Sequence, residues 1–122
     1  MNEYGLESPR ATELIEAARA MGPALVMRRE QCKAQRRVPE ETVQEFHDAG
    51  FFKILQPERW GGYAMDPQVF YMVGFEVARF CPSSAWILGV IAVHNWQLAV
   101  FDDRAAQDVW GEDPTVLISS SY

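Results

Sequence analysis

The 122-residue sequence has few cysteines, few basic residues and no long apolar run, and each shortage excludes a class of protein. Cys32 and Cys81 have no metal-ligand or redox-motif spacing, which favours isolated thiols in a reducing compartment over a disulfide scaffold. The formal net charge of -6 argues against nucleic acid and anionic membranes as partners. The apolar run at 85–93 is too short to span a membrane, and the N-terminus has no signal-peptide pattern. These observations predict a cytoplasmic protein.

Hydrophobic residues make up 48% of the sequence and recur at helical spacing, which predicts an all-α domain. Gly22-Pro23 should kink or split the first helix, and Ser83 or Ser84 should cap the last long one. That helix is apolar nearly all round and is expected to be buried. The four main helices are predicted near 9–36, 39–49, 67–80 and 84–101.

The segment FFKILQPERWGGYAM, at 51–65, is predicted to be an extended connection between the second and third helices. Pro57 fixes one backbone angle, whereas Gly61 and Gly62 permit turns that other residues resist. Trp60 is expected to be substantially buried and to hold this turn against the core.

His94 is the main candidate for chemistry, because a buried titratable group sometimes marks a functional site. The alternative is a core histidine that bonds a nearby carbonyl group. His47 lies on the polar side of its helix and is expected to be solvated, and Asp102 and Asp103 are predicted to be helix caps. The sequence has no P-loop, no dinucleotide-binding glycine fingerprint and no zinc-ligand spacing. The face that carries His94 also includes Ile87, Val90, Ile91, Leu98 and Phe101.

After Pro114 the composition changes to TVLISSSY, which is rich in β-branched and short polar residues and predicts the beginning of a strand. A lone strand has no partner and would leave an unpaired edge. We therefore expect a helical domain at 1–114 and the start of a truncated β-domain at 115–122.

These segments resemble the N-terminal helical domain of the acyl-CoA dehydrogenase superfamily. The shared pattern is Pro39 before a short helix, then DAGFF, ILQPERWGG and a helix that opens with DP. VHNWQLAVFDDRAAQDVWGEDP and ISSSY look like the flavin-dependent aromatic monooxygenase branch. That branch includes the oxygenase component of p-hydroxyphenylacetate hydroxylase and the secosteroid phenol hydroxylase. The similarity covers essentially the whole chain.

The resemblance implies the oxygenase component of a two-component system, in which a separate reductase supplies reduced FMN or FAD. With O2, the flavin would hydroxylate a phenol ortho to its hydroxyl group. The resemblance places His94 and Ser120 at that hydroxyl group, as catalytic and substrate-binding residues, and Trp86 in the pocket wall. It also implies a tetramer in the full-length form, whose missing domains supply most flavin contacts, so this chain alone is expected to be inactive.

Two alternatives stay open at this point. The first is an acyl-CoA dehydrogenase, or a sulfur- or nitrogen-oxidising relative, which takes its base from another domain and needs no histidine at position 94. The second is a non-catalytic helical module that binds another chain. The reading frame after Tyr122 separates them, because a continuing β-domain favours an enzyme and an early stop favours the module.

Overall fold

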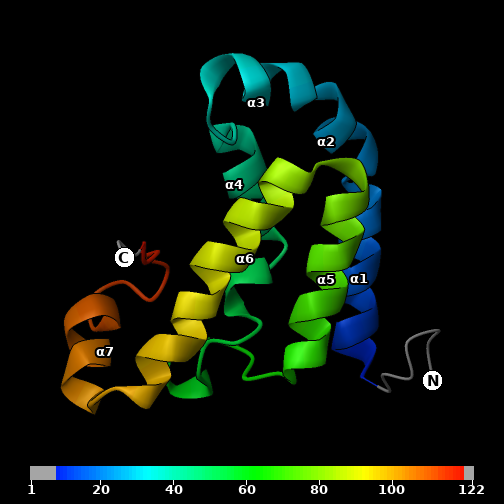
Figure 1. Cartoon of the computed structure of the whole chain (residues 1–122). Coiled ribbons are helices and arrows are strands. Elements are labelled where there is room, and N and C mark those ends of the chain that lie inside the picture. The colour runs from blue at the N-terminus through cyan, green and yellow to red at the C-terminus, as the bar shows by residue number, and fades with distance from the viewer. Residues whose placement is uncertain (1–7, 120–122) are drawn as a thin grey trace.

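The computed structural model describes residues 8–119, and within that range the chain is helical and contains no strand. The all-α prediction is therefore confirmed. None of the helices in this range is long and apolar enough to cross a membrane. The α-helices, drawn in Figure 1, are α1 (Pro9–Ala20), α2 (Gly22–Met27), α3 (Arg29–Gln35), α4 (Glu40–Asp48), α5 (Pro67–Phe80), α6 (Pro82–Gln97) and α7 (Asp103–Trp110).

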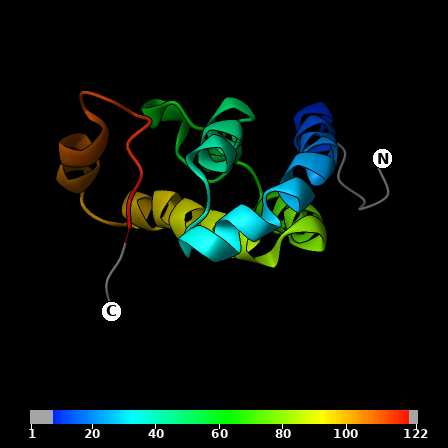
Figure 2. The same ribbon diagram turned by 90° about the horizontal axis from the view of Figure 1, so that it is seen from above.

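The long helices α5 and α6 pack side by side, and α1 runs along the other side of α5 (Figure 1). Figure 2 shows α1 and α4 on one side of the layer that α5 and α6 form, with α7 at the far end from α1. The hydrophobic core lies between these layers, where large apolar side chains lose nearly all contact with water. Its fully buried members include Phe46, Phe51, Val73, Val77 and Leu88.

The helix predicted over 9–36 is divided into three, with breaks at Met21 and Arg28. The first break is the expected one. Pro23 has no backbone N–H to donate, and Gly22 packs so closely on Phe80 that an added Cβ would lie 2.6 Å from its ring. The second break was not predicted, because no proline or glycine marks it.

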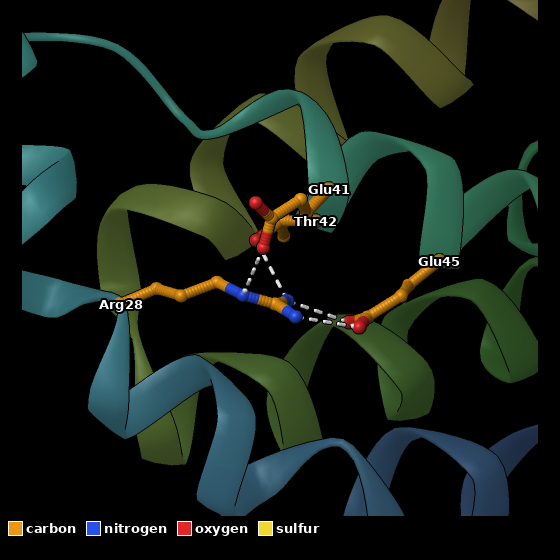
Figure 3. A network of polar contacts seen from close by, with 4 residues as sticks. All are labelled: Arg28, Glu41, Thr42 and Glu45. Atoms are coloured by element: carbon orange, nitrogen blue, oxygen red, sulfur yellow. Dashed lines mark hydrogen bonds and ion pairs between the residues drawn. The ribbon is translucent and has the colours of Figure 1, made fainter.

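Arg28, at the second break, turns its side chain toward α4 instead of toward water (Figure 3). Its guanidinium donates two hydrogen bonds of 2.8 Å to the carboxylate of Glu45, and a third of 3.3 Å to the hydroxyl of Thr42. Glu41 lies 3.4 Å from Nε. The bond from Glu45 raises the pKa of Arg28, although burial acts in the opposite direction. The side chain of Arg28 therefore joins the second break to α4.

The last long helix, α6, begins at Pro82, two residues earlier than predicted, and no side chain caps it. Ser84 does not serve as the cap, because its buried hydroxyl donates to the sulfur of Cys81 at 3.2 Å. At its other end the helix stops at Gln97 and tightens into the 3₁₀ turn η3 (Leu98–Val100). The helix is buried on the side that packs on the core, whereas large apolar side chains on its other side stay exposed.

The connection at 51–65 is not fully extended but contains two 3₁₀ turns, η1 (Phe51–Lys53) and η2 (Glu58–Trp60). Gly61 ends the second turn in a left-handed conformation with φ of 86°. At Gly62 an added Cβ would lie 2.0 Å from the carbonyl oxygen of Gln56, so the two backbones approach closely. The glycine pair thus permits a reversal that a side chain would block.

Trp60 is partly buried, and its indole nitrogen is removed from water. Its ring centroid lies 6.4 Å from that of Trp110, the last residue of α7. Together with Leu98 and Ala106, these rings form a second, smaller apolar cluster at the end of the molecule. The turn is therefore held against α7 and not against the main core.

The described part of the predicted final strand, 115–119, is irregular and pairs with no other strand among residues 8–119. It is anchored by side chains, because Leu117 packs on the main core and the indole nitrogen of Trp110 donates to the carbonyl of Val116 at 3.1 Å. Residues 120–122 lie outside the described range. The domain boundary after 114 and the β-domain beyond it stay predictions.

Candidate functional site

His94 lies in the last turn of α6 and is 4% exposed. Its Nδ1 is 2.9 Å from Oε1 of Gln97, one turn further along. Since an amide oxygen only accepts hydrogen bonds, Nδ1 carries the proton in this contact and Nε2 carries a lone pair. The buried Nε2 has no hydrogen-bond partner among the described residues. His94 is thus oriented at one nitrogen and left as an unused base at the other.

The contact at Nδ1 also fits the alternative of a core histidine that bonds a nearby carbonyl group, because the side-chain amide of Gln97 supplies that oxygen, so the free Nε2 is the feature that favours chemistry. A buried polar atom without a partner costs about 1–3 kcal/mol, and the described residues hold two more such atoms, Nε1 of Trp60 and Oδ1 of Asn95. Of the three, only Nε2 of His94 can act as a base near neutral pH. A partner that donates a hydrogen bond to Nε2 would recover that free energy. The geometry therefore suits a ligand with a hydroxyl group, which can donate to Nε2 or lose its proton there.

Asn95 fixes the rotation of α6 about its axis and so the direction of the neighbouring histidine. Its amide nitrogen donates to the carbonyl of Phe52 at 2.7 Å, and the side chain is 1% exposed. Gln56, also buried, donates to the carbonyls of Trp60 and Pro114 at 2.7 and 2.9 Å. These two amides tie α6, the glycine turn and the C-terminal segment into one rigid unit.

Trp86 is eight residues before His94, which at 3.6 residues per turn rotates it by about 80° around the helix. It is 74% exposed and lines a groove beside α3 that His94 does not reach. Ser120, the other predicted site residue, lies outside the described range. Residues 8–119 therefore do not bring the three predicted site residues together.

Two other residues from the sequence analysis, His47 and Asp102, take part in packing and helix capping. His47 is half-buried, not solvated, and its ring centroid lies 4.7 Å from that of Phe52. Asp102 caps α7 as predicted, by accepting a hydrogen bond from the backbone N–H of Arg104 at 2.9 Å. Within residues 8–119 no group of three or more histidine, cysteine or acidic side chains is placed to hold a metal ion.

An exposed apolar face lies along α6 and continues past its end. Trp86, Trp96, Val100 and Phe101 are exposed large hydrophobic residues on this stretch. Exposed apolar patches of this kind often mark surfaces that another chain or domain covers. His94 is on the same helix, but its side chain is buried and is not part of this exposed face.

Comparisons with known proteins place these features in context. The chain matches the family described as "Acyl-CoA dehydrogenase, N-terminal domain" over residues 8–110. The oxygenase subunit HsaA of a flavin-dependent monooxygenase from Mycobacterium tuberculosis is 43% identical over 112 residues, which are 92% of this chain and 28% of that protein. The oxygenase component of an FADH(2)-dependent resorcinol hydroxylase from Rhizobium sp. is 33% identical over 75% of this chain and 22% of that protein.

A crystal structure of the HsaA monooxygenase from M. tuberculosis superposes on this chain with a TM-score of 0.89, at 43% identity. The superposition covers 92% of this chain and 31% of that one. The chain thus spans less than a third of the length of the relatives it matches.

Proposed function

The chain belongs to the acyl-CoA dehydrogenase N-terminal domain family, and we propose that it is the N-terminal part of a flavin-dependent monooxygenase that hydroxylates a phenol. The family assignment confirms the resemblance found in the sequence. The names of the relatives support the narrower proposal, since they include an FADH(2)-dependent resorcinol hydroxylase and a p-hydroxyphenylacetate 3-hydroxylase from Acinetobacter baumannii. Resorcinol and p-hydroxyphenylacetate are both phenols.

The observation that carries the proposal is the free lone pair on Nε2 of His94. A phenol has a pKa of about 10 and is mostly protonated at neutral pH. Its ring reacts with an electrophilic oxygen far more readily once the hydroxyl proton is shared or removed. His94 performs that task by accepting the proton at Nε2, while the bond from Nδ1 to Gln97 holds the ring and its tautomer. Reduced flavin, FMN or FAD, supplies the activation of O2 when it is bound.

Access to His94 requires a rearrangement, because Nε2 is buried among the described residues. In the proposal, a neighbouring side chain moves aside when the phenol enters. Ser120 donates or accepts a second hydrogen bond at the phenol oxygen, worth about 0.5–1.5 kcal/mol. Trp86 lines the pocket from the exposed face of α6, once further protein covers that face.

The proposal also specifies the partner proteins and the cellular compartment. A separate flavin reductase delivers reduced flavin, and the full-length protein assembles as a homo-oligomer, with four copies in the form that the resemblance implies. The compartment is the cytoplasm, because two buried free thiols are typical of proteins in a reducing environment. This 122-residue chain lacks most of the length of its relatives, so catalysis belongs to the longer form.

The test measures hydroxylated product per reduced flavin oxidised in a full-length protein that carries this domain. In His94→Asn we expect flavin to be oxidised while product falls sharply, because the phenol keeps its proton. His47→Asn is the matched control, since it removes a half-buried histidine elsewhere in the fold, and it should keep the ratio of the unmodified protein. A ratio in His94→Asn equal to that of the control would refute the proposed role.

A further inference from the structure

A second feature of the molecule is an open groove of 770 Å³ between α3 and the beginning of α6. In Figures 1 and 2, α3 lies close to the start of α6, where the chain leaves α5. The volume is within the range of about 300–1,000 Å³ that is usual for sites of small organic ligands. His94 does not line this groove, so the groove is centred away from the histidine, although Trp86 lies at its edge.

The charge of the groove is opposite to that of the whole chain. Arg29, Lys33, Arg36 and Arg37 line it, and no aspartate or glutamate is among its lining residues. The sequence has 17 acidic and 11 basic residues, so a random patch of this size would be expected to include carboxylates. A concave surface with positive charge only attracts anions and raises their local concentration.

Two of these four cations are already engaged. Arg29 donates through Nε to the carbonyl oxygen of Phe80, and Arg37 forms an ion pair with Glu40. Lys33 and Arg36 are exposed and have no ion-pair partner among residues 8–119. Both are therefore free to contact an anion, and the charge of Arg29 adds to theirs because its carbonyl partner is neutral. Arg36 also has a positive φ of 52°, which is uncommon for a residue other than glycine. This left-handed conformation ends α3 and turns the chain away from the helix axis.

The floor of the groove is apolar. Cys32, Val38 and Cys81 are buried there, and the largely exposed ring of Trp86 forms one wall. Burial raises the pKa of Cys32, so its thiol stays neutral and adds no negative charge at physiological pH. A flat apolar group can lie against this floor and stack on the indole ring.

We propose that this groove binds an organic anion that has a flat apolar body and a terminal carboxylate or phosphate. The body lies on the floor against Trp86, and the anionic group contacts Lys33 and Arg36. Both charged contacts are stronger than neutral hydrogen bonds, and Arg36 can hold two oxygens of the anion at once. This binding goes beyond the proposed hydroxylation and requires neither flavin nor turnover.

The test uses calorimetric titration of the 122-residue chain with matched probes. 2-Naphthoate carries the flat body and a carboxylate, 2-naphthyl phosphate carries a phosphate, and 2-naphthamide has nearly the same shape as 2-naphthoate without charge. We expect one or both anions to bind at least about tenfold more tightly than 2-naphthamide, which is about 1.4 kcal/mol. The anion that binds more tightly shows whether the groove prefers a carboxylate or a phosphate. Inorganic phosphate alone should bind more weakly, because it cannot use the apolar floor.

Variants locate the binding and separate it from a general charge effect. Lys33→Gln with Arg36→Asn should weaken the anions by at least about tenfold, and asparagine tolerates the left-handed backbone at position 36. The control is Lys53→Gln with Arg104→Gln, which removes the same charge from exposed positions outside the groove. It should change the affinity less than about twofold, or roughly 0.4 kcal/mol. Thermal unfolding of each variant identifies any loss of fold.

In NMR spectra of the unmodified chain, the indole N–H signal of Trp86 should move on titration more than those of the other three tryptophans. The proposal is overturned if 2-naphthamide binds as tightly as the anions, if the two double variants behave alike, or if no probe binds at millimolar concentration. A signal shift centred on another tryptophan would also overturn it. None of these outcomes depends on hydroxylation, so the test can fail while the proposed function stands.

Discussion

Replacing Arg28 with methionine should destabilise the domain more than any other single loss of a surface arginine. Methionine keeps an unbranched apolar stem but removes the guanidinium that joins the corner between α2 and α3 to α4 (Figure 3). The two bonds of 2.8 Å to Glu45 are bidentate and charged, and the arginine side chain is 19% exposed. Bonds of this kind contribute about 1.5–3 kcal/mol each.

That range must be discounted, because the side chain of Glu45 is 35% exposed and water replaces part of the lost interaction. The free energy of unfolding should therefore fall by about 2 kcal/mol when the whole network is lost. In a domain of 122 residues that loss lowers the Tm by roughly 8 °C. Thermal unfolding followed by circular dichroism, supported by urea titration, measures both quantities.

Arg37→Met is the matched control, because Arg37 pairs with Glu40 at 3.3 Å and both side chains are largely exposed. Its effect should stay below about 1 kcal/mol and should vanish in high salt. Equal destabilisation by the two variants would refute the reasoning, and so would an unchanged Tm in Arg28→Met. A double-mutant cycle with Glu45→Gln isolates the pair, and a coupling energy near zero would locate the stability elsewhere.

Two further predictions concern the glycine turn and a surface ion pair. Gly62→Ala should lower the Tm strongly, because its Cβ would lie 2.0 Å from a backbone oxygen. Gly74→Ala in α5 is the control, since no atom lies within 4 Å of its added Cβ, and it should be neutral or stabilising. A Gly62→Ala variant as stable as Gly74→Ala would contradict the close approach. Hydrogen bonding from Arg59 lowers the pKa of Asp103, so an NMR titration should place it below 3.8 and return it toward that value in Arg59→Gln. The stability that this pair contributes is present above the unfolded-state pKa of the aspartate and is lost as pH falls through the lowered folded-state value. An unchanged titration in Arg59→Gln would show that the contact is absent in solution.

The sequence predicted the parts of the fold that depend on local signals. Ser8 and Asp66 accept hydrogen bonds from the backbone at the starts of α1 and α5, and each is followed by a proline, as the pattern indicated. Cap residues act within three positions of themselves, so their effect can be seen in a single sequence.

Features that depend on distant contacts were missed. The break at Arg28 arises from carboxylates 13 and 17 positions further on, although the spacing of Glu41 and Glu45 on one helix face was a usable signal. The contact between Gln56 and Pro114 joins segments 58 residues apart, and no local pattern marks it. Local reasoning also could not determine which faces of α6 would be covered.

The candidate site was predicted in part. His94 was selected from its position on an apolar helix face, and the structure adds the oriented Nδ1 and the free Nε2 that the sequence does not reveal. Trp86 shares the helix but not the face, because eight residues do not complete a whole number of turns. The cationic groove was missed, because its lining combines residues 29–38 with residues 81–87, and no local pattern joins these two segments.

The most direct test of the account is the pH dependence of phenol hydroxylation by full-length protein with and without His94. If Nε2 accepts the phenol proton, His94→Asn should slow hydroxylation at neutral pH by about 10²–10⁴-fold, the usual contribution of a general base. The ratio of the two rates should fall toward one as pH approaches about 10, because the phenol then arrives already ionised. A ratio that stays constant across this pH range, or a variant as fast as the unmodified protein at neutral pH, would contradict the account.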